Sequence, residues 1–204
     1  MHVYFYRPHP YAARMERGAE HTVQRLGRLA WLLAALALLA ACSAVPLRPG
    51  QLQNPALRTI HTAFERTVEA AQDDPNIEWH SGWLGNMWVN FWKGDNRGLC
   101  YQWQQLVYNG VAPAARRVGW DATGIVINAG TRHEHHAVLV FDPRKVRRDA
   151  LLTPEGRTHV YVLDAWREGQ ADIYRLTDWL KLPFAVESTA RLQTLQVRPP
   201  AGSG

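Results

Sequence analysis

The spacing of apolar residues changes once along this chain, and this change narrows the possible folds more than any other feature. In residues 57–107 the apolar side chains recur three or four positions apart, which is typical of helices. In residues 124–176 they occur as short β-branched runs bounded by Gly, Asp and Pro, which is typical of strands. The order predicts an α+β domain in which N-terminal helices pack on a small antiparallel sheet.

Three helices are predicted in the first half of this domain. The first, over residues 54–72, begins with an Asn-Pro pair that supplies an N-cap and a proline at the first helical position. The second, over residues 79–92, is unusually aromatic, and its side chains form either a bulky core or the wall of a groove for a carbohydrate or peptide. The third, over residues 99–110, follows a run of turn residues and is expected to stop at its final Asn-Gly pair.

Four strands are predicted in the second half, over residues 124–128, 137–141, 159–163 and 173–176. We expect them to pair as an antiparallel sheet, with a long excursion between the second and the third. That excursion contains a basic run at residues 144–148. The run is either a solvated face or a surface that meets lipid phosphates or an anionic glycan.

A basic segment and an apolar run of thirteen residues, 29–41, precede the domain. The run is too short to span a bilayer as a helix, and its basic flank is typical of a signal peptide, which we place at residues 1–41. Met15 is an alternative start, in which case residues 1–14 are not translated. The leader holds five of the 23 basic and two of the 18 acidic side chains, so the net charge of +5 falls to +2 without it. Nothing in this charge requires a nucleic-acid partner.

The end of the apolar run, Leu39-Ala40-Ala41-Cys42-Ser43, resembles the lipobox of bacterial lipoproteins. The resemblance implies cleavage before Cys42, attachment to the bilayer through lipid on this cysteine and, with Ser43 next, sorting to the outer membrane facing the periplasm. Residues 42–53 are then the lipidated cysteine and a tether, residues 54–198 one domain, and residues 199–204 a disordered tail. The alternative is an ordinary secretory signal with an incidental cysteine.

Cys100 is the second of two cysteines in the chain, and the lipobox resemblance leaves it as a free thiol in an oxidising compartment. It falls in the first turn of the third predicted helix. Unpaired amides and the positive end of the helix dipole favour a thiolate there and can receive an oxyanion. The alternative is a buried, inert cysteine.

A histidine and an aspartate are expected to approach this thiol from the sheet. His136 opens the second predicted strand and Asp164 closes the third, and in an antiparallel hairpin these two ends lie side by side. A nucleophilic thiol needs an imidazole as proton carrier, and the imidazole needs a third group to orient it. We therefore predict a cluster of Cys100, His136 and Asp164. His135 is the alternative base, because a shift of one residue exchanges the faces of a strand.

The segments around these residues resemble the papain-like superfamily of cysteine hydrolases, which includes papain-type peptidases, NlpC/P60 endopeptidases and transglutaminase-like proteins. The similar segments are residues 97–103, 135–140 and 162–166, within a region of about 94–168. The resemblance implies a papain-like core and a cysteine peptidase, amidase or acyltransferase that acts on amide bonds through a thioester. It implies no cofactor and no metal. The envelope location suggests peptidoglycan stem peptides or an envelope protein as substrate.

The chain departs from this pattern near the cysteine. Gly94 stands where papain-type enzymes have the glutamine of the oxyanion hole, and Asn96, Asn90 or Trp92 are the candidates to replace it. Two other functions stay open. The histidines of residues 132–136 are a candidate zinc cluster. A non-catalytic lipoprotein module would keep the fold and use a degenerate pocket for binding.

Overall fold

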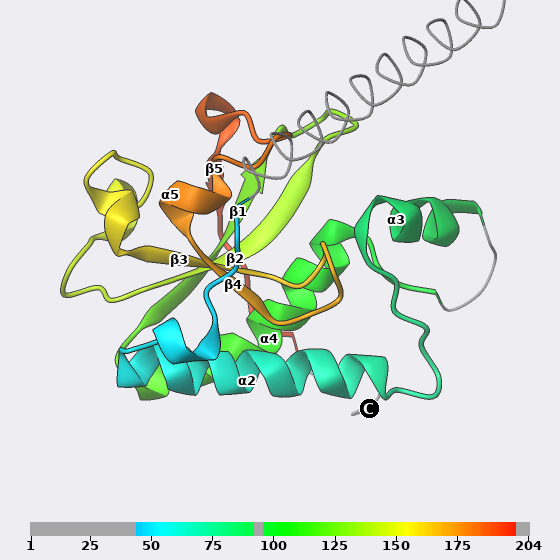
Figure 1. Ribbon diagram of the computed structural model, residues 1–204, viewed down its shortest axis with the longest axis horizontal. Helices are drawn as coiled ribbons and strands as arrows, with labels where there is room; N and C mark the ends of the chain where they lie inside the picture. Colours follow the sequence, from blue (N-terminus) through cyan, green and yellow to red (C-terminus); the bar gives the residue numbers. More distant parts are fainter. Residues whose placement is uncertain (1–43, 92–95, 199–204) are drawn as a thin grey trace, which may run out of the picture. The chain divides into compact units, whose positions relative to one another are not determined.

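The computed structural model describes residues 44–91 and 96–198 (Figure 1). The predicted signal peptide, Cys42, Trp92, Gly94 and the tail 199–204 lie outside the described residues. Within the described ranges, no helix combines the length and the apolar character that a membrane span requires. The α+β class predicted for the domain is confirmed, because helices accompany a five-stranded antiparallel sheet.

The helices largely follow the predicted spacing. The main ones are α2 (Pro55–Gln72), α3 (Gly82–Phe91), α4 (Cys100–Arg117) and the short α5 (Leu176–Trp179). The described part of the chain also holds the 3-10 helices η1 (Pro49–Gln51), η2 (Arg148–Ala150), η3 (Gly156–His159) and η4 (Glu187–Thr189). The predicted N-cap of the first helix is confirmed, since the side chain of Asn54 accepts a hydrogen bond from the amide of Ala56 at 2.9 Å.

The second helix begins later than predicted, at Gly82 instead of residue 79. Trp79 belongs to a short bridge with Arg97, just before α4, and its ring lies 4.6 Å from that of Trp103. This bridge keeps Trp79 in an extended conformation, so α3 starts only after it.

The third helix does not stop at Asn109-Gly110, as was predicted, but continues through Pro113 to Arg117. Gly110 serves the packing of α4 on α2 instead, because a Cβ at this position would overlap the side chain of Thr67. The apolar face continues beyond the glycine with Val111, which is fully buried. Packing against α2 and the sheet therefore outweighs the local stop signal.

The sheet has the strand order β4-β3-β2-β1-β5, and all its neighbours are antiparallel. The strands are β1 (Asp121–Ile127), β2 (His135–Phe141), β3 (Val160–Asp164), β4 (Asp172–Arg175) and β5 (Arg191–Gln193). Four of them match predicted strands. The edge strand β5 was not predicted, because its three residues are too few to show a period.

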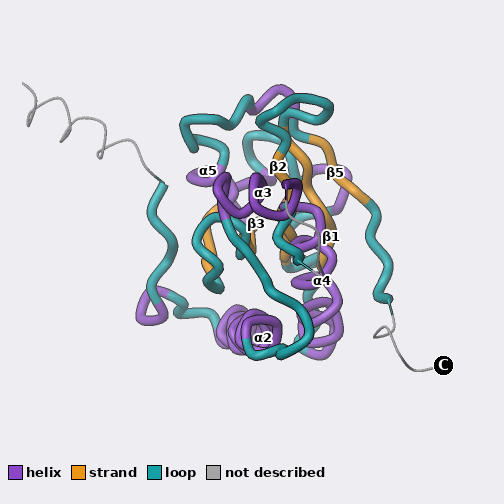
Figure 2. The backbone as a smooth tube through the Cα atoms, turned by 90° about the vertical axis from the view of Figure 1, so that its right-hand side faces the viewer, coloured by secondary structure: helices purple, strands orange, loops and turns teal. Residues whose placement is uncertain are grey.

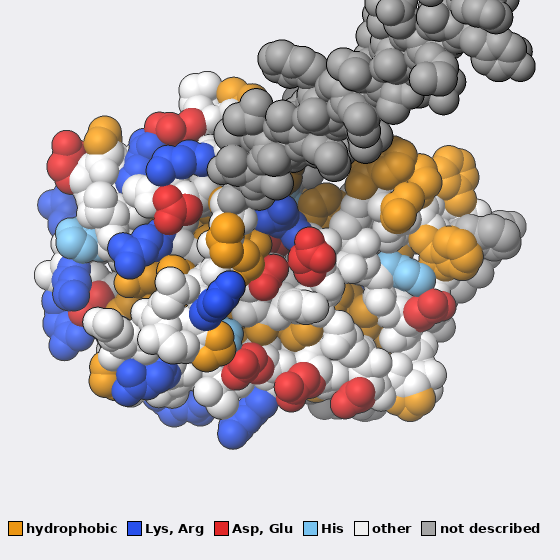
Figure 3. All heavy atoms as spheres, viewed as in Figure 1, with side chains coloured by type: hydrophobic (Ala, Val, Ile, Leu, Met, Phe, Trp, Pro, Cys, Tyr) orange, Lys and Arg blue, Asp and Glu red, His pale blue; other side chains and the backbone are white. Residues whose placement is uncertain are grey.

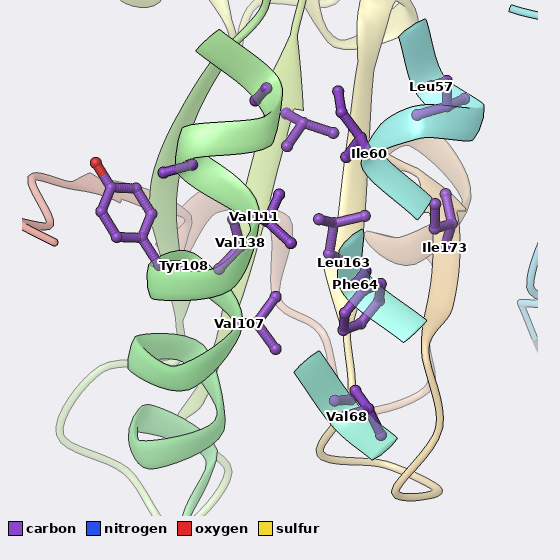
Figure 4. Packing of buried hydrophobic residues seen from close by; sticks show 14 of the residues in the cluster. Leu57, Ile60, Phe64, Val68, Val107, Tyr108, Val111, Val138, Leu163 and Ile173 are labelled. Carbon is purple, nitrogen blue, oxygen red and sulfur yellow. The ribbon is translucent and has the colours of Figure 1, made fainter. Parts of the chain in front are cut away.

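Helices α2 and α4 cover one face of this sheet, and α5 with its neighbouring loops covers the other. Figure 2 views α2 along its axis, below the strands. In Figure 4, Val107 and Val111 of α4 point toward Val138 and Leu163 of the sheet, with Phe64 of α2 beside them. Both faces of the sheet are thus buried, which explains why β2 is buried along its whole length.

Residues 44–52 lie against the domain and are not a free tether. The amide of Leu47 donates a hydrogen bond to the carbonyl of Ile173 at 2.7 Å. Leu52 is 2% exposed and belongs to the core between α2 and the sheet. The folded unit therefore begins earlier than the predicted boundary at residue 54, because this segment carries apolar side chains that the core accepts.

Candidate active site

Cys100 is the first residue of α4, at the helix N-terminus as the sequence predicted. The turn before it is fixed by Gln102, whose Oε1 accepts hydrogen bonds from the amides of Gly98 and Leu99 at 2.9 and 3.0 Å. The thiol is mostly buried, and its Sγ donates to the carbonyl of Glu134 at 3.7 Å. The first turn of α4 therefore lies against the residue that precedes β2.

His135, at the start of β2, lies between this thiol and Asp164. Its Nε2 is 2.8 Å from Oδ2 of Asp164, and both side chains are 1% exposed. Its Nδ1 is also buried and has no hydrogen-bond partner within the described part of the chain. Because Asp164 occupies one nitrogen, the other is the ring atom available to exchange a proton with Cys100.

Three aromatic side chains pack around the imidazole of His135. Its ring centroid lies 4.7 Å from that of Trp166, 5.5 Å from that of Trp179 and 5.6 Å from that of Phe184. These rings exclude water and hold the plane of the imidazole. The imidazole is therefore held with Nε2 directed at Asp164.

The carboxylate of Asp164 is held by more than the histidine. Its Oδ2 also accepts a hydrogen bond from Nε1 of Trp179 at 2.9 Å, and its Oδ1 accepts one from the amide of Trp166 at 3.3 Å. These donors satisfy the acceptor oxygens of a carboxylate that is almost completely buried. Trp179 was not predicted as a site residue, because its helix of four residues gives no periodic signal.

His136, the predicted base, lies on the opposite face of β2, so the predicted contact with Asp164 is corrected. Val138 pairs with Leu163, so the same antiparallel register places residue 137 opposite residue 164. His135 shares their face because side chains of a strand alternate. The imidazole of His136 instead contacts Gln193 Oε1 at 3.2 Å and Glu134 Oε1 at 2.8 Å.

The charged forms of His135 and Asp164 stabilise each other. Burial alone lowers the pKa of His135, but the charge and hydrogen bond of Asp164, with smaller contributions from Cys100, raise this pKa from 6.5 to about 9. Burial also acts to raise the pKa of Asp164, but His135 and the hydrogen bond from Trp179 hold it below its usual range. At neutral pH the pair is therefore an imidazolium and a carboxylate.

Glu134 links this site to the loop before β2. Its carbonyl accepts a hydrogen bond from the thiol of Cys100, while its carboxylate accepts hydrogen bonds from the amide of Gly130 and from His136. These two bonds lower the pKa of Glu134. No pattern in the sequence singles out Glu134, since its role depends on the path of the loop.

A cavity of about 320 Å³ opens beside His135. Its lining combines aromatic rings with charges of both signs, from residues Trp83, Arg132, Glu134, Trp166, Arg167 and Glu168. A larger cavity of about 500 Å³ lies between residues 45–49 and α2, and none of Cys100, His135 and Asp164 lines it. The smaller cavity is lined by His135 but not by Cys100 or Asp164, so it is the one of the two that reaches the imidazole of the candidate site.

Of the candidate oxyanion donors, Trp92 lies outside the described residues and Asn90 is bonded inside its own helix. Nδ2 of Asn90 donates to the carbonyl of Asn86 inside α3, at 2.8 Å. Over residues 44–91 and 96–198, no group of three or more His, Cys, Asp or Glu side chains is arranged to hold a metal ion. Of the clustered histidines, His135 and His136 each face a carboxylate on opposite sides of the strand.

Comparison with known proteins adds no relative from which a role can be transferred. A scan against protein-family models gave no match, and searches of curated proteins and of solved structures gave none either. The geometry of Cys100, His135 and Asp164 is therefore the basis for any function assigned to the chain.

Proposed function

We propose that this chain is an envelope lipoprotein whose domain is a cysteine hydrolase or acyltransferase acting on amide bonds. The observation that supports this proposal is the position of His135, which lies between the carboxylate of Asp164 and the thiol of Cys100. A thiol at a helix N-terminus, a base and an orienting carboxylate are the groups that nucleophilic catalysis requires. A papain-like core, with His135 in place of the predicted His136, is part of this proposal.

The reaction would proceed through a thioester on Cys100. In the reactive state His135 already holds the proton that the thiol has lost, and Sγ attacks as the thiolate on the amide carbonyl carbon to form a C–S bond. His135 then gives its proton to the amine nitrogen as the C–N bond breaks, so the amine leaves neutral. Water or a second amine attacks the thioester, His135 takes its proton, and the sulfur leaves as the thiolate, which restores the pair of thiolate and imidazolium. Asp164 keeps the imidazole oriented and stabilises its charged form.

The location and the substrate class follow from the sequence before the domain. The apolar run of residues 29–41 and Cys42 support export and attachment to the outer membrane, with the domain facing the periplasm. Stem peptides of peptidoglycan and envelope proteins offer amide bonds in that compartment. The cavity beside His135 carries both positive and negative side chains, which suits a peptide with charged groups of both signs.

The second candidate is a binding module that has kept this arrangement without catalysis. The observation that favours it is the state of Cys100, which is 7% exposed and donates to the carbonyl of Glu134. A thiol held in this way can be structural. The two candidates differ in the reactivity that they predict for this sulfur.

Alkylation by iodoacetamide near neutral pH separates these candidates, with the label on the Cys100 peptide measured by mass spectrometry. A free thiol is only a few per cent ionised at pH 7, so an ionised Cys100 should react about tenfold faster than N-acetylcysteine or more. His135→Ala should abolish this enhancement. His136→Ala is the matched control and should retain it, because its ring faces Glu134 and Gln193.

A slow rate in the native protein, equal to that of the model thiol and unchanged in His135→Ala, would show that the catalytic proposal is wrong. The binding module would then be the better description. An enhancement that disappears in His136→Ala and persists in His135→Ala would refute the assignment of the base.

A further inference from the structure

Helix α3 exposes a row of large apolar side chains, in contrast to the bulky core that was one interpretation of its sequence. Trp83 is 65% exposed, Leu84 70%, Trp88 45% and Phe91 80%. Their positions along the helix place them on one side, and we call them the α3 face. In Figure 3, hydrophobic side chains gather over α3 at the right of the view. No residue of α3 carries a charge.

The other side of α3 is fixed to the domain next to the candidate active site. Nε1 of Trp166 donates to Oδ1 of Asn86 at 2.9 Å, and the amide of Gly82 donates to the carbonyl of Trp166 at 2.5 Å. Gly85 is buried against His80, where a Cβ would lie 2.9 Å from the Cβ of that residue. The helix is thus held with its apolar side outward, and contiguous apolar surfaces of this kind mark interaction sites.

The chain before the domain indicates what this face meets. Only one residue, Ser43, separates Cys42 from the described segment, and residues 44–52 lie against the domain through Leu47 and Leu52. Two residues of extended chain span at most about 7 Å. A lipid on Cys42 would therefore keep the domain at the level of the headgroups. Figures 1 and 2 both show α3 and the beginning of the described chain above α2 in the view, and residues 45–49 then run down toward that helix.

We propose that the α3 face docks onto the bilayer that holds Cys42, with its apolar side chains in the headgroup and upper acyl region. Tryptophan is enriched at this level of membranes, because its ring is apolar and its N–H is polar. This inference rests on the lipid attachment in the proposed function and not on the chemistry of Cys100. Trp83 belongs both to the α3 face and to the cavity beside His135, so the cavity opens near the membrane surface.

Fluorescence quenching by brominated lipids tests this docking on the full lipidated chain. The protein is reconstituted into vesicles of phosphatidylethanolamine and phosphatidylglycerol, with or without bromine in the upper acyl chains. Bromine quenches tryptophans that contact the acyl region. The native protein should be quenched, and a variant with Trp83→Phe and Trp88→Phe should lose most of that quenching, because phenylalanine keeps the face apolar but removes the fluorophores.

A second pair of variants tests whether the apolar character of the face drives docking. Phe91→Ser should reduce the quenching of Trp83 and Trp88. Val197→Ser is the matched control: Val197 is also exposed, at 44%, but follows Gln196, whose carbonyl is bonded to the side chain of Gln105 on α4. This control should leave the quenching unchanged.

Each contrary outcome has a separate meaning. A chain that does not float with the vesicles would refute the lipid attachment and the docking together. A chain that floats, but whose quenching is the same in the native protein and in the double tryptophan variant, would refute docking alone. A blue shift of the emission that grows with protein density and is insensitive to bromine would assign the α3 face to a second copy of the chain. None of these outcomes depends on the alkylation of Cys100.

Discussion

Replacing Asp164 by Asn should destabilise the domain in a strongly pH-dependent way, because the change removes a charge and keeps the shape. The folded-state pKa of His135 is raised from 6.5 to about 9. A shift of this size corresponds to about 3 kcal/mol of stability. For a raised histidine pKa, this stability is fully present below pH 6.5 and is lost as the pH rises through 9. Asp164→Asn should therefore cost about 3 kcal/mol at pH 6 and much less at pH 10.

Urea unfolding of the native protein and the variant at intervals from pH 6 to pH 10 measures this difference. The imidazole of His135 should also titrate near pH 9 by NMR in the native protein, as its raised pKa indicates, and at a clearly lower pH in Asp164→Asn. A cost of the substitution that is the same at every pH would refute the reasoning. It would mean that the contact between His135 and Asp164 stabilises the fold as a neutral hydrogen bond.

Asp172 pairs with Asp164 across β3 and β4 and provides a control. Its replacement by Asn is expected to stabilise the domain, whereas Asp164→Asn destabilises it. Burial raises the pKa of Asp172 to about 6, although a hydrogen bond from Tyr174 acts to lower it. Because the folded-state pKa of Asp172 lies above its ordinary value of 3.8, protonated Asp172 stabilises the domain below pH 3.8. This stability is lost as the pH rises through 6, where the buried carboxyl group becomes charged. Asp172→Asn should therefore stabilise the domain at pH 8, by about 1 kcal/mol after allowance for solvent screening. Destabilisation at pH 8 would contradict this explanation.

Two further substitutions test the support of the site and the packing of the helices by urea unfolding. Trp179→Phe removes the donor to Oδ2 of Asp164 and should cost about 1.5–3 kcal/mol, since the acceptor is charged and buried; an unchanged midpoint would show that this hydrogen bond contributes nothing. Gly110→Ala should cost about 1–3 kcal/mol, because the new methyl group overlaps Thr67 of α2. Gly50→Ala, where the added methyl group meets open space, is its control, and equal midpoints for the two alanine variants would exclude the overlap.

Periodicity predicted most of the fold, since the helices and four strands are long enough to show their spacing. It failed where a local signal competes with packing. An Asn-Gly pair commonly ends a helix, but Gly110 is instead the point where α4 approaches α2. Periodicity also cannot distinguish an apolar helix side that faces the core from one that faces outward, which is why α3 was open to two interpretations.

The candidate site was predicted in part. Cys100 and Asp164 lie where the order of helix and strands places them, at a helix N-terminus and a strand end. The choice between His135 and His136 depends on the register of β2 against β3, which a single sequence does not reveal. The contributions of Glu134 and Trp179 depend on loops and a short helix, where the sequence shows no period.

The three aromatic rings around His135 have a consequence for turnover. Trp166, Trp179 and Phe184 pack against the ring, and Asp164 occupies Nε2, so a flip of the imidazole would break that bond and disturb these ring contacts. The same nitrogen, Nδ1, therefore serves both half-reactions of the proposed cycle. Proton delivery and proton removal would follow one path, with no reorientation of the ring between acylation and deacylation.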